Sequence, residues 1–492
     1  MLENSKEILQ SYKTKSSAYW QRVEQYHALQ TFKEAVKTVP AYRTFLKSNK
    51  IKAQAIRDYR DFLVLPYINK KNYFHVYEHE ELVKNNFFET ESLVMTSTSG
   101  STGQPTYFPR TSAIDWQYSV LAEFFLNNGP KGSTLVVNCF GMGVWVGGVI
   151  TYQAFRDAGL RGYPVTIISP GINKKEIFHS LRELAPHFKN VIVAGYPPFI
   201  KDILDEATIE KINFSKFHTR LLFAAESFTE SFRDHVAAIT HIKNVHADTL
   251  NIYGSAEMGA MAFETPGSIL IRRLALKNRK VFEALFPQKS TPTLAQYNPA
   301  FVSFEAQDKT ILITANNAVP FVRYKIGDTG GIFSLEQITS IFKDHGINLA
   351  KEAAKKKAPL LSLPFVYVHV RDDFSTKLYG AIIHPQHIQE ALQKNAFKNI
   401  TTGKFTMATK ATKHHDQYLE INIELRKNIT ASEKIKKSLQ HAIMESLLQK
   451  NAEYKNNFHS IPEKVKPVIT LWDHESTEYF KPGIKQNWVI KN

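Results

Sequence analysis

The sequence predicts an α/β protein with a large N-terminal domain and a smaller α+β C-terminal domain. At 492 residues the chain is too long for one hydrophobic core, so two or more domains are expected. Through its middle, apolar strand-like runs alternate with amphipathic helical runs, which is typical of mixed sheets that are substantially parallel. After Gly331 the pattern changes, and a lysine-rich helical stretch leads to a further small unit.

The first 95 residues are predicted to be mainly helical, with interruptions at Pro40 and Pro66. Residues 1–90 are therefore interpreted as a helical lead-in to the large domain. The strands that follow are expected at 93–96, 134–139, 165–169, 191–195, 219–225, 249–254 and 311–315.

Amphipathic helices are expected between these strands, for example over 198–212 and 229–242. Ser227 and Glu230 stand at capping-box spacing and are predicted to begin the second helix. The apolar run 134–155 carries four glycines and several polar side chains, and no second such run follows. We interpret it as a buried strand, loop and helix and expect no membrane span.

Short polar loops follow several of the expected strands. They are TSTSGSTG after the first, GYPP after 191–195, AES after 219–225 and GSAE after 249–253. Ligands of open α/β sheets bind at the carboxyl ends of the strands, so these loops are expected to gather around one site.

The C-terminal unit is predicted to mix strands and helices. We place the boundary near 371–374, which gives domains over 1–371 and 372–492. Ile435, Leu439, Ile443 and Leu447 recur at a spacing of four and predict a helix that faces the core. The expected elements are a strand at 365–370, a helix at 385–396, strands at 403–409 and 417–425, a helix at 432–449 and a strand at 467–471.

Composition excludes several classes of protein. The single cysteine, Cys139, excludes a disulfide framework and a multi-cysteine zinc site, and it fits a reducing compartment, so a cytoplasmic protein is expected. Basic residues exceed acidic ones, 62 − 46 = +16, but they are scattered along the chain. We expect no nucleic-acid role, because an anionic substrate or a solvated basic surface explains the charge equally well.

The loop TSTSGSTGQPT (96–106) concentrates hydroxyl groups around Gly100 and Gly103. Glycine lets the backbone approach a ligand closely, and successive N–H groups form a nest for an anion. The loop lacks the lysine of a Walker-type phosphate loop. Taken alone, it fits a phosphate-binding loop and an exposed Ser/Gly turn equally well.

Four motifs occur in a recognisable order: TSTSGSTGQPT, YGSAEMG (253–259), RYKIGD (323–328) and VRDDFSTKLYG (370–380). This order resembles the adenylate-forming superfamily of acyl-CoA synthetases, luciferases and adenylation domains. NCFGMGVWVGG, GYPPFI and GAIIHPQHIQEAL are similar to the phenylacetate–CoA ligase-like branch. The resemblance covers about residues 90–490 and implies an adenylation domain followed by a small mobile domain.

The resemblance implies that ATP activates a carboxylic acid to an acyl-adenylate, which a thiol then attacks. It implies ATP, Mg²⁺ and CoA as cofactors. Tyr253 would stack on adenine, with Gly254 and Ser255 in the same turn, and Glu257 would bind Mg²⁺, which prefers oxygen ligands. The residues expected to bind the β- and γ-phosphates are Thr96, Ser97, Ser99, Gly100, Ser101, Thr102 and Gly103.

Further residues follow from the same resemblance. Asp328 would accept hydrogen bonds from both ribose hydroxyls, and Glu226 would lie beside the adenine or the acyl pocket. Arg371 would approach the ribose or phosphate, and Asp373 would be the hinge residue. Lys485 would bridge the carboxylate and the α-phosphate as a catalytic cation.

The loop also departs from the pattern of the family, whose loops often carry a cation next to the proline. The matching positions here are Gln104 and Thr106, both neutral. Arg110 is the nearest cation in sequence, and we expect it or an arginine from elsewhere to supplement backbone N–H groups and Mg²⁺.

The expected function is that of an AMP-forming carboxylate–CoA ligase acting on a small acid. Two alternatives stay open: transfer of the acyl group to an acyl carrier protein or an amine, and a degenerate, non-catalytic nucleotide-binding homologue. Aromatic residues near the expected acyl pocket favour an aryl or other apolar acid, although buried aromatics are often simply core. These residues are Phe140, Trp145, Tyr196, Phe199 and Phe223.

Overall fold

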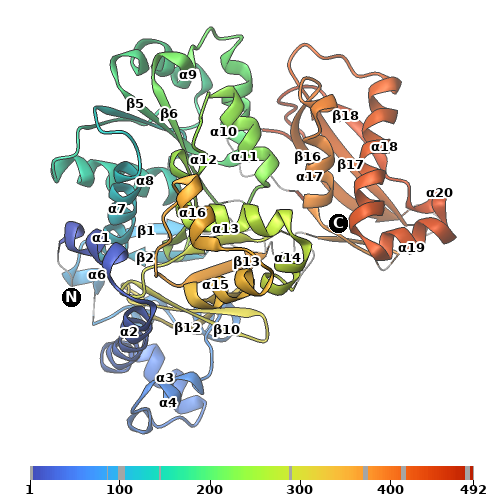
Figure 1. Cartoon of the computed structure of the whole chain (residues 1–492). Coiled ribbons are helices and arrows are strands. Elements are labelled where there is room, and N and C mark those ends of the chain that lie inside the picture. The colour runs from blue at the N-terminus through green and yellow to red at the C-terminus, as the bar shows by residue number, and fades with distance from the viewer. Residues whose placement is uncertain are drawn as a thin grey trace.

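A computed structural model describes residues 4–85, 87–97, 106–142, 146–225, 227–287, 291–369, 375–379, 381–411, 417–481 and 488–490. It contains a large sheet covered by helices and a smaller unit of residues 375–490 that lies beside it (Figure 1). The predicted boundary at 371–374 lies outside the described residues.

An eleven-stranded sheet, ordered β10-β11-β12-β13-β9-β8-β7-β6-β5-β3-β4, organises the large unit. The half of the sheet that runs from β7 to β4 is parallel, as the alternating pattern predicted. The five parallel strands are β3 (Thr134–Asn138), β4 (Val165–Ile168), β5 (Asn190–Gly195), β6 (His218–Ala224) and β7 (Thr249–Ser255). β3 and β5 are buried along their whole length, which explains their continuous apolar sequences.

Helices cover both faces of this parallel half. In β3, Leu135 and Val137 join the core under α9 (Lys174–Glu183), α10 (Pro197–Ala207) and α11 (Glu230–Ile239). Val136 points the other way, into the core formed with α7 (Ser112–Asn127) and α8 (Val146–Leu160). Alternate side chains of a strand point to opposite faces, so one strand supplies both cores.

The other half of the sheet, from β10 to β8, is antiparallel. Helices α13 (Pro266–Lys277), α14 (Arg279–Leu285), α15 (Leu335–Asp344) and α16 (Leu349–Lys356) pack on it, and the short helix α12 (Val245–Asp248) lies beside β6 and β7. The strand expected at 365–370 in the small unit is β13, and that assignment was wrong, because β13 pairs with β9 and β12 in the large sheet. The antiparallel strands are β8 (Gly259–Phe263), β9 (Thr293–Gln296), β10 (Val302–Gln307), β11 (Thr310–Ala315), β12 (Phe321–Phe333) and β13 (Phe365–His369).

The lead-in is helical, as predicted, and packs on the antiparallel half. Pro40 stands in the first turn of α3, directly after α2 ends, so it does interrupt the helical pattern. Phe32 of α2 shares a core with Phe304 of β10 and Ile313 of β11. The helices are α1 (Ser5–Thr14), α2 (Ser17–Thr38), α3 (Pro40–Ser48), α4 (Tyr59–Leu63), α5 (His79–Leu82) and α6 (Phe87–Thr90), with short helical turns at Ala53–Ala55 and Lys70–Phe74.

Two local expectations are corrected. The run at 93–96 does form a strand, β1 (Val94–Ser97), but it pairs with β2 (Tyr107–Arg110) in a separate two-stranded hairpin. α11 is capped by Thr229, whose side chain accepts from the backbone N–H of Phe232, and Ser227 lies outside the helix. The run 134–155 is a strand, loop and helix as expected, and no described helix is long and apolar enough to cross a membrane.

The small unit has its own hydrophobic core. β16 (Thr401–Ala411) pairs antiparallel with β17 (Gln417–Leu425), which pairs in parallel with β18 (Val468–Trp472). A second hairpin joins β14 (Thr376–Leu378) to β15 (Ala381–Ile383). The helices are α17 (Pro385–Leu392), α18 (Glu433–Lys450), α19 (Ala452–Ser460) and α20 (Pro462–Val465), and the predicted stripe of α18 faces this core.

Charged groups join the small unit to α10 of the large unit. The Lys201 ammonium donates to the carbonyl oxygen of Thr402 at 2.7 Å. Lys404 pairs with Asp202, and Arg426 pairs with Asp205. Asp202 is almost fully buried, so the contact between the units removes its carboxylate from water. The stability of the contact therefore depends on Lys404, which pairs with Asp202.

Candidate functional site

The strand that leads into the expected phosphate loop (96–106) lies against the turn that carries Glu257. β1 and β2 pair from Val94↔Arg110 to Ser97↔Tyr107, so Thr96 and Ser97 stand at the end of the described hairpin. The Thr96 hydroxyl donates to the carbonyl oxygen of Ala256 at 2.9 Å. This contact joins two of the four motifs, whose residues are far apart in sequence.

The turn between β7 and β8 requires glycine at two positions. A Cβ at Gly254 would lie 2.4 Å from the carbonyl oxygen of Gly259 across the hairpin, which no side chain tolerates. Gly259 itself has a φ of +68°, in the left-handed region that favours glycine. The two glycines therefore close the hairpin tightly and fix the direction of the Glu257 side chain.

Glu257 is a buried, ionised carboxylate. It is 5% exposed, and Lys70 lies with its ammonium nitrogen 2.8 Å from Oε1. The Tyr324 hydroxyl donates to the same oxygen at 3.3 Å. Burial raises the pKa of Glu257. Lys70 and the hydroxyl of Ser255 lower the pKa by more than burial raises it, so the net shift is downward. A charged oxygen ligand at the end of the phosphate loop fits Mg²⁺.

Tyr253 and Asp328, predicted to bind adenine and ribose, are also together. The Tyr253 hydroxyl donates to Oδ2 of Asp328 at 2.5 Å. The ring of Tyr253 lies on β7, 6.2 Å from that of Phe304, and Asp328 is buried on β12. Tyr253 and Ser255 stand at the end of β7, Glu257 follows in the turn, and Asp328 of β12 lies against Tyr253.

Several predicted residues lie outside the described residues. No contact is therefore assigned to Ser99, Gly100, Ser101, Thr102, Gly103, Glu226, Arg371, Asp373, Lys485 or to Trp145 of the aromatic set. Ser97 is buried at the end of β1.

The aromatic set does not form one pocket. The rings of Phe140 and Tyr196 are 5.4 Å apart, in contact with the core under α7 and α8. Phe199 and Phe223 belong to the core on the opposite face of the sheet, where Phe223 packs on Phe228. Phe199 and Phe223 are therefore core residues, and the case for an aryl acid is reduced to the pair Phe140 and Tyr196.

Sequence reasoning missed Lys70 and Tyr324. Tyr324 stands inside the RYKIGD motif and could have been singled out from it. Lys70 lies in the lead-in, in the sequence INKKN, which belongs to no motif. Only the folded chain brings it to Glu257.

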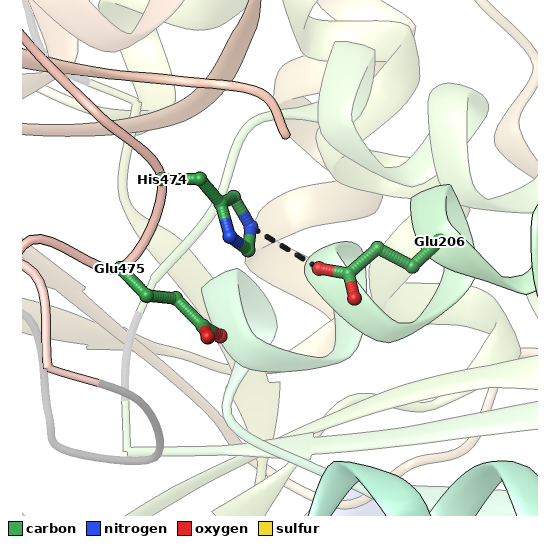
Figure 2. Close-up of side chains that lie close together, drawn as sticks. All are labelled: Glu206, His474 and Glu475. Carbon is green, nitrogen blue, oxygen red and sulfur yellow. Dashed lines mark ion pairs between the residues drawn. The ribbon is translucent and has the colours of Figure 1, made fainter. Parts of the chain in front are cut away.

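Among the described residues, one group of three has the spacing of a metal site: Glu206, His474 and Glu475 (Figure 2). His474 lies 3.2 Å from Oε1 of Glu206. Lys174 already pairs with both carboxylates, 2.8 Å from Oε1 of Glu206 and in contact with Oε1 of Glu475. With an ammonium group between them, these side chains are an ion-pair network that joins the two units.

No protein-family model and no curated protein matches the chain. Solved structures do match over nearly its whole length. Two crystal structures of 2-hydroxyisobutyryl-CoA ligase in the postadenylation state match with TM-scores of 0.69 and 0.68, at 15% identity, over 98% of this chain and 91% of that chain. The same ligase with 2-HIB-AMP and CoA in the thioesterification state matches with a TM-score of 0.54, at 15% identity, over 97% and 90%.

These matches cover both units of the chain and carry no information about its substrate. The TM-scores of the two postadenylation structures are higher than that of the thioesterification structure. The chain therefore has the fold of the adenylate-forming CoA ligases, as the order of its motifs predicted.

Proposed function

We propose that this protein activates a small carboxylic acid with ATP to an acyl-adenylate and then transfers the acyl group to CoA. The observation that carries the proposal is the convergence of Thr96, Tyr253, Glu257 and Asp328 at the carboxyl end of β7. These residues come from three of the four motifs, and each has the chemistry that one part of ATP requires.

The roles of the described residues follow from their atoms. The Asp328 carboxylate would accept hydrogen bonds from the ribose hydroxyls. These would replace the hydrogen bond that it accepts from the Tyr253 hydroxyl. Glu257 would hold Mg²⁺, which neutralises phosphate charge when bound. The hairpin loop from Thr96 onward would hold the β- and γ-phosphates through backbone N–H groups.

Four roles rest on the sequence motifs alone. Lys485 would offset the charge of the carboxylate and the α-phosphate in the first step. Arg371 and Glu226 would contact the nucleotide, and Asp373 would be the hinge of the small unit. The same motifs support a phenylacetate–CoA ligase-like branch, with an aryl or other apolar acid.

ATP–pyrophosphate exchange, screened over a panel of aryl, branched and short-chain carboxylic acids, tests the first half of the proposal. We expect one class of acid to promote exchange and the same acid to give a CoA thioester when CoA is added. If exchange occurs but CoA does not react, an acyl carrier protein or an amine is the acceptor. Absence of exchange with every acid would favour a non-catalytic nucleotide-binding homologue.

A further inference from the structure

The neutral phosphate loop raises the question of which cation meets the triphosphate. Arg110 is the nearest in sequence, but it lies at the base of the β1–β2 hairpin, opposite Val94. Three residue pairs separate it from the tip, which is about 10 Å at the rise of a strand. Arg110 is buried, and its guanidinium group lies under Gly259, where a Cβ would be 2.5 Å from Nη2. Arg110 therefore packs against the β7–β8 turn and is remote from the tip of the hairpin.

Lys70 contacts the same turn through Glu257. Its ammonium nitrogen is 2.8 Å from Oε1 of Glu257, while its side chain is 32% exposed and that of Glu257 6%. The neighbouring His75 contacts the hydroxyl of Thr106 at 3.4 Å, at the point where the loop re-enters the hairpin. The segment 70–75 therefore borders the loop at Thr106 and the magnesium ligand at Glu257.

The backbone around Lys70 is held firmly. Ile68 is fully buried, and its carbonyl oxygen accepts from the N–H of Lys325 at 2.8 Å. Phe74 packs on Phe108 of the hairpin and on Tyr324 of β12, with ring centroids 5.1 and 5.6 Å apart. Lys70 thus stands on a turn held by these contacts, and its partly exposed side chain reaches Glu257.

We propose that Lys70 supplies the cation that the loop lacks and binds the β- and γ-phosphates of ATP. The inference rests on the proposed function and adds a binding residue from the lead-in. Lys70 is the cation that pairs with Glu257. If Glu257 holds Mg²⁺ when the nucleotide binds, the Lys70 ammonium group would pair with the β- and γ-phosphates in place of that carboxylate.

Isothermal titration calorimetry with MgATP and with AMP tests this assignment in the full chain. Lys70→Ala should raise the Kd for MgATP about 10-fold, the size of one charge-assisted hydrogen bond, and leave the Kd for AMP unchanged, because AMP lacks both phosphates. Lys71→Ala, at an exposed neighbouring lysine, is the matched control and should change neither. Gln104→Lys added to Lys70→Ala should restore part of the MgATP affinity, because it returns a lysine to the loop.

Two results would overturn the assignment while the proposed function stands: an unchanged Kd for MgATP in Lys70→Ala, or an equal loss of affinity for MgATP and AMP. Equal loss of both affinities with an unchanged melting temperature would mean that Lys70 maintains the conformation of the turn and does not bind phosphate. If the parent chain binds neither nucleotide, the proposed function itself fails, and the role of Lys70 fails with it.

Discussion

Glu257 combines burial with charge, and this makes it the most informative single residue of the site. A buried carboxylate without a partner would become neutral, but Lys70 keeps the pKa of Glu257 below its usual value. The side chain is therefore an anion throughout the neutral pH range. Since the resemblance implies that it binds a divalent cation, the charge is the property that matters.

Glu257→Gln keeps the shape of the side chain and removes this charge. We expect pyrophosphate exchange to fall by about 10² or more, which is typical when one electrostatic contact to a transition state is removed. Raising the Mg²⁺ concentration should recover part of the rate. Glu283→Gln, at an exposed glutamate of α14, is the control and should exchange like the parent. Full activity of Glu257→Gln at low Mg²⁺ would remove Glu257 from the metal site.

At the scale of elements, the β7–β8 hairpin is the part of the sheet on which the site depends. It carries Tyr253, Ser255 and Glu257 within a few residues and contacts the phosphate loop through Ala256. Its geometry is fixed by close backbone contact, because Gly254 faces the carbonyl oxygen of Gly259 without space for a methyl group.

Gly254→Ala should therefore displace the turn. A Cβ 2.4 Å from a backbone oxygen cannot be accommodated by rotation of a side chain, so the hairpin must open. We expect exchange activity to fall at least about 10-fold, in line with the effect of small displacements of catalytic groups. Gly159→Ala in α8 is the control, since its nearest neighbour is 3.8 Å away and alanine favours a helix. Equal activity of the two variants would show that the turn tolerates the change.

Helix α2 provides a prediction about pH. Glu24 lies between α2 and β10, where its Oε1 accepts from the Tyr297 hydroxyl at 2.7 Å and from the N–H of Phe304 at 3.1 Å. Burial raises the pKa of Glu24 to about 7, against the smaller effect of these two donors. An acid with a raised pKa stabilises the fold below its unfolded pKa of about 4.3, and this contribution is lost as the pH rises through 7.

Glu24→Gln keeps both accepted hydrogen bonds and cannot ionise. We expect its melting temperature to equal that of the parent at pH 5 and to exceed it by a few degrees at pH 8. The measurement is a series of thermal melts between pH 5 and 8 at constant ionic strength. If the melting temperatures of parent and variant decline in parallel over this range, ionisation of Glu24 does not destabilise the fold.

The elements that the sequence predicted well are those whose own residues determine them. β3 and β5 are continuous apolar runs because both of their faces are buried, and α18 shows its core-facing stripe directly. The errors concern pairing and caps. Nothing in VMTS indicates that β1 pairs only with β2, and Ser227 and Thr229 are equally suitable caps until the helix axis is known.

The same distinction applies to the site. Tyr253, Glu257 and Asp328 stand in motifs whose order is recognisable, so the contact of Tyr253 with Asp328 could be expected, and their roles toward ATP stay predictions. The contact of Lys70 with Glu257 could not be expected, because it depends on how the lead-in packs against β12. The division of the aromatic set between two cores was also beyond prediction, since it depends on which face of the sheet each ring occupies.

At the scale of the whole molecule, the contact between the two units is highly charged. Lys404 lies between Asp202 of the large unit and Glu424 of its own unit, with its ammonium nitrogen 3.4 Å from Oε2 of Glu424. Arg426 meets Asp205 in the same contact. If the proposed function holds and the adenylate forms in the arrangement described here, these pairs stabilise the state that forms it.

This inference separates the two half-reactions. In Lys404→Met the docked arrangement leaves Asp202 buried without its ion-pair partner, which costs about 3–5 kcal/mol, whereas an undocked arrangement would expose Asp202 to water. Pyrophosphate exchange should therefore fall by about 10² or more. Thioester formation from a supplied acyl-adenylate should stay near the parent rate, because it does not require this contact.

The exposed Lys427, next to Arg426, gives the matched control: Lys427→Met should leave both half-reactions unchanged. Small-angle scattering of the nucleotide-free proteins adds a readout that is independent of activity. Lys404→Met should have a larger radius of gyration than the parent or Lys427→Met, because its small unit leaves α10 more often. Equal loss of both half-reactions with an unchanged radius would mean that Lys404 supports the fold of the small unit. The charged contact would then have no separate effect on either half-reaction.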